Sequence, residues 1–246
     1  MRFYNQIFAG TLISTIGLVG CSNVNSGFYE EEAVQALDLL TENIGELNSC
    51  SFTLISSDEQ RNGEESRTTF KETDAYIKSA DQMYFYSVGD NGRRGVWINE
   101  GELSLFLFDE NQFETRQVPK DLLRTIDSIN DKYKFHFPAA DFFYPSLTDD
   151  LIDFADSLFL NEDVIVDGVL HKEVFAKTSD KEIFIWIDSE SNLPKQFEIY
   201  NFNSEEGESS YVATFSNWVK DPKLPSKLFE FSPPENAVES ELLKRR

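Results

Sequence analysis

Hydrophobic and polar positions alternate along most of this chain at the period of β-strands. Between residues 50 and 118 the alternating runs form three consecutive pairs, and the sequence Gly89-Asp90-Asn91-Gly92 between the second pair is typical of a hairpin turn. Short strands in which each follows its neighbour predict a meandering antiparallel sheet of about a dozen strands. The predicted strands are 50–57, 67–76, 83–88, 93–98, 103–108, 113–118, 158–166, 170–178, 182–188, 195–202, 209–219 and 228–231.

Two regions carry the helical period instead. Apolar residues first recur every three or four positions between Ala33 and Leu47, which predicts one amphipathic helix before the sheet. The second region is an insertion at about 119–157, where two further apolar stripes flank an unusually aromatic stretch between Phe135 and Tyr144. The pattern therefore predicts a mainly β (α+β) fold, with an N-terminal helix and a helical insertion that interrupts the strands.

Several predicted strands are apolar on both faces. The runs at 83–88 (MYFYSV), 103–108 (LSLFLF) and 182–187 (EIFIWI) do not alternate as a sheet with one wet face should. The N-terminal helix can cover one face, so the other face must meet a second layer or a cavity. Two interpretations stay open: a roomy apolar pocket lined by aromatic side chains, and a closed sandwich core with no void.

The N-terminus indicates where the protein is located. Residues 1–20 have a positive start and an apolar run of 14 residues from Ile7 to Gly20, as in a secretory signal, and this run is shorter than the about 20 residues that span a bilayer. Leu18-Val19-Gly20-Cys21 resembles the lipobox of bacterial lipoproteins, so Cys21 is the predicted lipid attachment site. Ser22 in place of Asp favours the outer membrane, with the body in the periplasm. Residues 21–28 would form a lipidated tether, and 29–246 a single domain.

Charge and cysteine content narrow the function further. The formal net charge of −22 would repel nucleic acid and anionic membrane surfaces, so the acyl chains rather than a basic patch would anchor the protein. Of the two cysteines, Cys21 would be acylated, and Cys50 is then expected to be a small buried residue rather than a reactive thiol. A monomer is expected.

No motif for catalysis is found in the sequence. His136 and His171 lie in unrelated segments and lack the ligand spacing of a metal site, so each is expected to be structural. A nucleophile turn, a phosphate-binding glycine loop and a dinucleotide fingerprint are all absent from the sequence. We therefore expect no enzyme activity, no catalytic residues, no metal and no cofactor.

Taken together, the motifs resemble an uncharacterised family of bacterial predicted periplasmic proteins, related in fold to the lipoprotein carriers LolA and LolB. The resemblance covers nearly all of the chain after the signal. It is carried by the order of six pieces: the helix leading into a Ser-Phe-Thr strand (33–53), Asp90-Asn91-Gly92-Arg93-Arg94 before Trp97, Phe137-Pro138-Ala139-Ala140-Asp141-Phe142-Phe143, Ile185-Trp186-Ile187-Asp188 before Leu193-Pro194-Lys195, Thr214-Phe215-Ser216-Asn217-Trp218, and Phe229-Glu230-Phe231-Ser232-Pro233-Pro234.

The resemblance implies an unclosed antiparallel β-barrel with helices in its mouth and an interior that takes acyl chains. The expected ligand is thus a lipid or an acylated protein, and the alternative is an envelope sensor or interaction lipoprotein that uses the same fold without ligand transport. The residues expected to line the interior are Trp97, Phe106, Phe184, Trp186, Phe197 and Trp218, although a register error of one residue would turn them outward. Ordinary core packing is the alternative role for these six. The residues expected to form a lid are Phe135, Phe137, Phe142 and Phe143.

Overall fold

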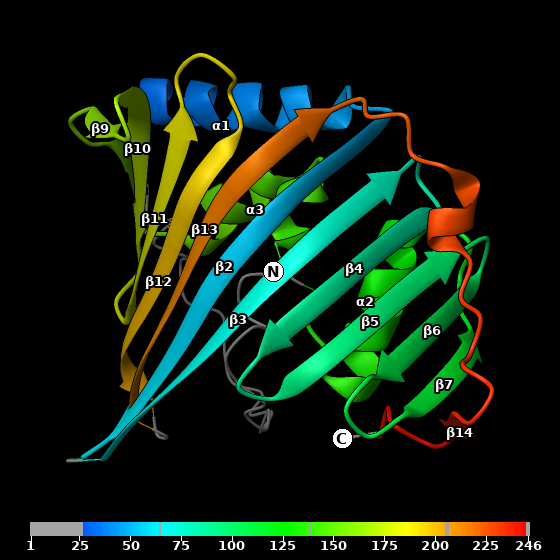
Figure 1. The fold of residues 1–246 in the computed structure, drawn as a ribbon. Helices are drawn as coiled ribbons and strands as arrows, with labels where there is room; N and C mark the ends of the chain where they lie inside the picture. The colour runs from blue at the N-terminus through cyan, green and yellow to red at the C-terminus, as the bar shows by residue number, and fades with distance from the viewer. Residues whose placement is uncertain (1–26, 64, 138, 205–206, 245–246) are drawn as a thin grey trace, which may run out of the picture.

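A computed structural model describes residues 27–63, 65–137, 139–204 and 207–244 of the protein. They form one strongly curved 14-stranded sheet with the order β1-β8-β10-β11-β12-β13-β2-β3-β4-β5-β6-β7-β14, and β9 pairs with β10 beside this path (Figure 1). The strands are β1 (Phe28–Tyr29), β2 (Ser49–Asn62), β3 (Glu65–Lys78), β4 (Gln82–Gly89), β5 (Gly92–Asn99), β6 (Glu102–Leu107), β7 (Gln112–Gln117), β8 (Ser157–Leu160), β9 (Val164–Val166), β10 (Val169–Lys177), β11 (Lys181–Asp188), β12 (Pro194–Ser204), β13 (Gly207–Lys220) and β14 (Val238–Glu239).

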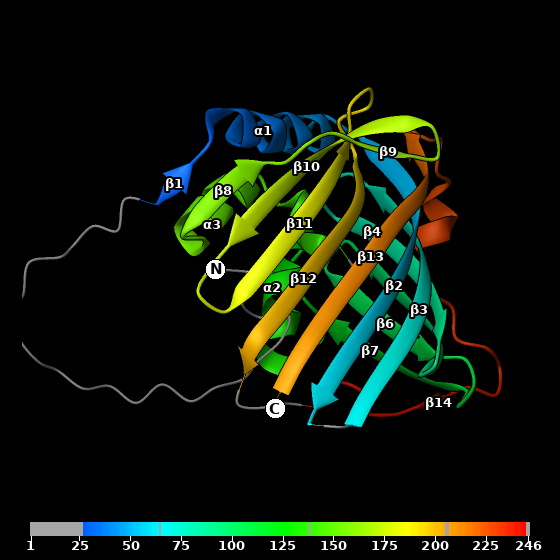
Figure 2. The ribbon, with the colours of Figure 1, turned by 90° about the vertical axis from the view of Figure 1, so that its left-hand side faces the viewer.

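The sheet curves without closing on itself. Its central strands are antiparallel, and only the short outer pairs β1–β8 and β7–β14 are parallel. The outermost strands β1 and β14 lie at opposite ends of the strand order, so the sheet is a half-barrel with a concave and a convex face (Figure 2). The predicted mainly β fold, with an N-terminal helix and an unclosed antiparallel sheet, is confirmed.

Helices fill the concave side of the half-barrel (Figure 1). The helix α1 (Glu31–Gly45) buries Ala33, Leu37, Leu40 and Ile44, the predicted apolar stripe. The insertion consists of α2 (Leu122–Tyr133), the 3-10 helix η1 (Ala140–Phe143) and α3 (Leu147–Phe154). The carboxylate of Asp121 accepts a hydrogen bond from Arg124 N (2.9 Å), so it caps the N-terminus of α2.

Strand register separates the two faces of the sheet. Phe52 on β2 pairs with Ala75 on β3, which pairs with Phe85 on β4, so these three side chains share one face. The Phe85 ring meets Phe137 of the insertion edge-on, at a centroid separation of 5.7 Å, which identifies this face as the concave one. The main hydrophobic core therefore lies between the concave face and the helices.

The C-terminal segment (221–243) crosses the convex face of β4–β7. It carries the 3-10 turn η2 (Ser226–Phe229), which lies against β4 and β5, and the chain then passes around the β7 edge to β14 (Figure 1). The predicted strand at 228–231 is wrong, because Phe229 is buried in η2, and Phe231 packs on Trp97 at a ring separation of 4.9 Å. This segment is the second layer that the doubly apolar strands β4 and β6 required.

Candidate functional site

A pocket of about 300 Å³ opens on the concave face, at the end of the sheet away from α1. One wall is the inner surface of β2, β3, β5 and β13, and the other is the lid segment, which we define as residues 134–137, directly after α2. We refer to this cavity as the basic pocket. Its lining residues are Ser56, Asp58, Thr69, Phe70, Lys71, Asn91, Arg94, Lys134, Phe135, His136, Phe137 and Tyr211.

Aromatic side chains make part of the pocket apolar. The Tyr211 ring packs on Phe197 at 5.3 Å, and burial raises the pKa of its hydroxyl to about 12, so Tyr211 stays neutral. Phe135 and Phe137 contact each other edge-on at 5.3 Å. These rings continue from the pocket into the main core.

Positive side chains form another part of the pocket surface. Lys71, on β3, lies opposite Ser56 of β2, and burial beside Arg94 lowers the pKa of the Lys71 ammonium to about 8. Burial also lowers the pKa of Arg94, while Lys134 and Lys71 add their repulsion to burial in lowering that of His136. The one carboxylate among the lining residues is Asp58, whose pKa burial raises above its ordinary value. The pocket is thus basic inside a strongly acidic protein.

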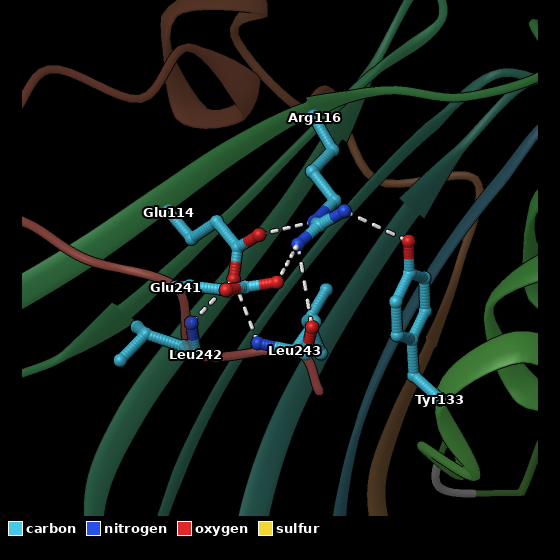
Figure 3. A network of polar contacts seen from close by, with 6 residues as sticks. All are labelled: Glu114, Arg116, Tyr133, Glu241, Leu242 and Leu243. Atoms are coloured by element: carbon cyan, nitrogen blue, oxygen red, sulfur yellow. Dashed lines mark hydrogen bonds and ion pairs between the residues drawn. The ribbon is translucent and has the colours of Figure 1, made fainter. Parts of the chain in front are cut away.

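A polar network holds the end of α2 from which the lid segment leaves (Figure 3). Arg116 on β7 donates through Nη1 to Tyr133 Oη (2.8 Å), and its guanidinium lies 4.8 Å from the Tyr133 ring centre. Arg116 also pairs with buried Glu114, whose carboxylate accepts hydrogen bonds from Leu242 N (2.6 Å) and Leu243 N (2.7 Å). One cluster therefore joins β7, α2 and the C-terminal segment.

Phe137 separates the basic pocket from the apolar core. It is 3% exposed and lines the basic pocket, a cavity of about 30 Å³ under α2 and an apolar void of about 20 Å³ beneath the insertion. Lys134 and Ala139, on either side of it, have φ angles of 53° and 55°, a left-handed conformation that costs about 1–2 kcal/mol in a residue other than glycine. Two residues in this conformation therefore flank the stretch that places this ring.

The residues expected to line the interior are divided between the two faces. Phe197 packs in the concave core against Phe142, and Trp218 packs on Phe52 at a ring separation of 4.4 Å. The other four point to the convex face, so their predicted inward orientation is corrected: Trp97, Phe106, Phe184 and Trp186. Register explains the error, because Ile185 of β11 faces the core beside Phe197, and its neighbours Phe184 and Trp186 then face outward.

The four residues expected to form a lid lie on the concave side. Phe137 and Phe142 are buried, Phe143 stacks on Phe52 at 6.0 Å, and partly buried Phe135 lies beneath the Arg94 guanidinium. Whether they open and close stays a prediction.

The convex face carries a second aromatic feature, which we call the outer aromatic row: Phe28, Phe159, Phe175, Phe184 and Tyr200, with successive ring centroids 4.8–6.3 Å apart. A cavity of about 430 Å³ lies at the Phe184–Tyr200 end of this row and is also lined by Glu173, Glu182 and Glu198. The indole N–H of Trp186 donates to Glu173 (2.5 Å). This face is aromatic and acidic, in contrast to the basic pocket.

Other predicted positions fall outside these sites. Cys21 and most of the tether (21–28) lie outside the described residues. Cys50 is buried, and burial with nearby Asp221 raises the pKa of its thiol to about 12. His171 is buried on β10, with Nδ1 2.9 Å from Val169 O, whereas His136 lines the basic pocket. In the described ranges no helix is long and apolar enough to cross a membrane.

The basic residues of the pocket were not predicted from the sequence. Lys71, Arg94 and Lys134 come from β3, β5 and the residue after α2, so no local motif contains all three. The available signal was the alternation of side chains along β3. Lys71 shares the inward face with Thr73 and Ala75, although a lysine is expected on the solvated face of a strand.

An unclosed antiparallel sheet whose concave face holds helices and a pocket of mixed aromatic and basic character makes this protein a β half-barrel. The chain belongs to the family of predicted periplasmic proteins DUF2092, whose model matches residues 33–243. The resemblance to a predicted periplasmic family is confirmed. No curated protein matches the chain.

Some solved structures are similar to this chain at low sequence identity. LprF from Mycobacterium bovis is 11% identical with a TM-score of 0.47, and the match covers 86% of this chain and 100% of that one. MucB is 15% identical with a TM-score of 0.45; the match covers 85% of this chain but only 66% of MucB. The LolA superfamily protein NE2245 from Nitrosomonas europaea is 11% identical with a TM-score of 0.33, over 81% and 97% of the two chains.

Proposed function

We propose that this protein is a non-catalytic binding protein of the cell envelope that holds the apolar chain of a lipid or acylated protein on its concave face. One observation carries the proposal: Phe137 alone lines the basic pocket, the apolar void and the small cavity between them. Moving that side chain outward would join the three into one channel under the insertion.

The expected interior is apolar enough to hold a chain. The void beneath Phe137 is lined by Phe52, Ala75 and Phe85, among other core side chains. Each methylene buried there would contribute about 0.8 kcal/mol, so a chain of moderate length can offset the displacement of one aromatic ring. In the absence of a ligand, Phe137 occupies the space and keeps the core dry.

The proposed location in the cell envelope is inferred from the family and from the N-terminal sequence. DUF2092 proteins are predicted to be periplasmic. Acylation of Cys21 and sorting to the outer membrane are parts of the proposal, and the protein would act as a tethered monomer. Enzyme activity is not part of it.

The test is mass spectrometry of lipids that co-purify with a chain beginning at Ser22, which keeps every described residue. We expect stoichiometric lipid, or binding of added monooleoylglycerol. In Phe137→Ala the joined cavity should bind monooleoylglycerol more tightly, whereas Phe184→Ala on the convex face should leave binding unchanged. Protein that carries no lipid and binds none would refute the proposal.

The outer aromatic row favours a second candidate, an envelope interaction protein. Its half-exposed rings and three carboxylates fit a partner segment rich in Lys or Arg, through cation–π contacts and ion pairs. Under this hypothesis Phe184→Ala would abolish association with a basic protein partner, and Phe137→Ala would not.

A further inference from the structure

We propose that the basic pocket recognises an anionic head group, phosphate or carboxylate, of an amphipathic ligand, with Lys71 and Arg94 as its principal contacts. This inference rests on the proposed function, because the same ligand would place its chain beneath Phe137. It adds the chemical class of the ligand, an anionic amphiphile.

The strand register places Lys71 and Arg94 on the same face of the sheet. Lys71 on β3 and Arg94 on β5 lie on the concave face, since each pairs through β4 with residues of the inward register. Strand β4 contributes Gly89 opposite Lys71 and Ser87 opposite Arg94, so only small residues stand between the two cations. The Lys71 and Arg94 side chains therefore line the same cavity.

The positive charge of Lys71 and Arg94 is only partly compensated within the pocket. In the described part of the chain, Lys71 and Arg94 form no ion pair within 4 Å, although Arg93 beside them pairs with Asp109 at 2.7 Å. Burial and the repulsion from Arg94 lower the pKa of Lys71, and the attraction of Asp58, the one lining carboxylate, does not outweigh them. A bound anion would supply the remaining negative charge.

The entrance of the basic pocket also carries basic side chains. Lys134 and His136 are exposed on the lid segment and line the same pocket, so they extend the positive surface toward solvent. Acidic groups dominate the rest of the protein, with 44 Asp and Glu against 22 Lys and Arg. An anion approaching this protein is thus attracted only where such a basic cluster lies.

The apolar surfaces next to the cations favour an amphiphile over a small anion as the ligand. Phe135 lies beneath the Arg94 guanidinium at 5.8 Å, and Phe137 is the next apolar surface inward. A volume of about 300 Å³ is at the lower end of ligand pockets, so it accommodates a head group while the chain continues inward. The sequence of surfaces from basic to aromatic to aliphatic matches head group followed by chain.

The experiment compares ligands that differ only in charge. Binding of oleoyl lysophosphatidic acid, oleate, monooleoylglycerol and inorganic phosphate to the chain from Ser22 is measured by calorimetry below micellar concentrations. We expect at least one anionic amphiphile to bind about 10-fold to 100-fold more tightly than monooleoylglycerol, because a hydrogen bond to a charged group strengthens binding by that factor.

Variants assign the preference to the pocket. Lys71→Met and Arg94→Met should each remove most of the preference for anions and leave monooleoylglycerol binding unchanged, whereas Lys223→Met, at an exposed position, should change neither. Circular dichroism confirms that each variant is folded, and Lys71→Gln repeats the test with a polar side chain.

The possible failures are distinguishable. Equal binding of charged and neutral amphiphiles would overturn this inference and leave the proposed function standing. Inorganic phosphate bound as tightly as lysophosphatidic acid would make the pocket a free-anion site and overturn the amphiphile assignment. No binding of any amphiphile would overturn the proposed function and the inference together.

Discussion

Replacing Lys71 by methionine should stabilise the protein. The Lys71 ammonium is partly buried, faces Arg94, and has no ion-pair partner within the described residues. Methionine keeps the length and most of the volume of the side chain while removing the charge. A residue kept only for stability would behave in the opposite way.

The magnitude follows from the pKa. Burial and Arg94 lower the pKa of Lys71 from 10.5 to about 8, which corresponds to about 3 kcal/mol. At pH 7, below both values, the folded and unfolded states are both protonated, and the folded state bears this full cost. Between pH 8 and 10.5 the unfolded chain binds more protons than the folded one, so wild-type stability should rise with pH across that window.

Urea denaturation of the chain from Ser22 measures the effect. At pH 7 we expect Lys71→Met to raise the free energy of unfolding by up to about 3 kcal/mol, with an advantage that shrinks as pH increases from 8 to 10.5. Lys223→Met, at an exposed position, is the matched control and should change stability little. A Lys71→Met variant that is less stable than wild type at pH 7 would refute the reasoning.

Three further predictions concern other parts of the fold. Phe231→Ala should cost about 2 kcal/mol in urea denaturation, because its ring packs on three aromatic side chains, whereas Phe202→Ala at a 45% exposed position should cost much less. Glu114→Gln should cost about 1.5–3 kcal/mol and speed hydrogen exchange at 238–243, since its carboxylate accepts two backbone N–H groups there; unchanged exchange would contradict this role. Cys50 should resist iodoacetamide at pH 8 until urea unfolds the protein, because burial raises its pKa to about 12, and rapid native labelling would contradict it.

Local patterns were sufficient to predict most elements. The apolar stripe from Ala33 to Ile44 became α1, and the Asn91-Gly92 turn joins β4 to β5 as expected. These predictions succeed because helix period and turn chemistry depend on neighbours in sequence. The convex-face cover over β4–β7 could not be predicted in this way, since it comes from the C-terminal segment, far away along the chain.

Orientation within a strand was harder to predict. In β11, large apolar side chains occupy both faces, so composition does not indicate which parity faces inward. Ile183, Ile185 and Ile187 are inside, while the larger Phe184 and Trp186 are half-exposed outside. Choosing the aromatic residues as interior therefore selected the wrong face, and only the pairing of β11 with β12 decides it.

The side chains around Lys71 explain how its cost to stability is related to its proposed role in ligand binding. The chain has twice as many acidic as basic residues, so a carboxylate at any neighbouring inward position could have neutralised Lys71. Most of those positions instead hold small hydroxyl residues, Ser56, Thr73 and Ser87, of which the last two hydrogen-bond each other at 2.8 Å, and the one lining carboxylate is Asp58. The small hydroxyl side chains leave volume in the pocket, and Asp58 offsets only part of the positive charge of Lys71, Arg94 and Lys134. Under the proposed function, the ligand's head group would supply the compensation, and the stability lost to Lys71 in the free protein would be recovered on binding.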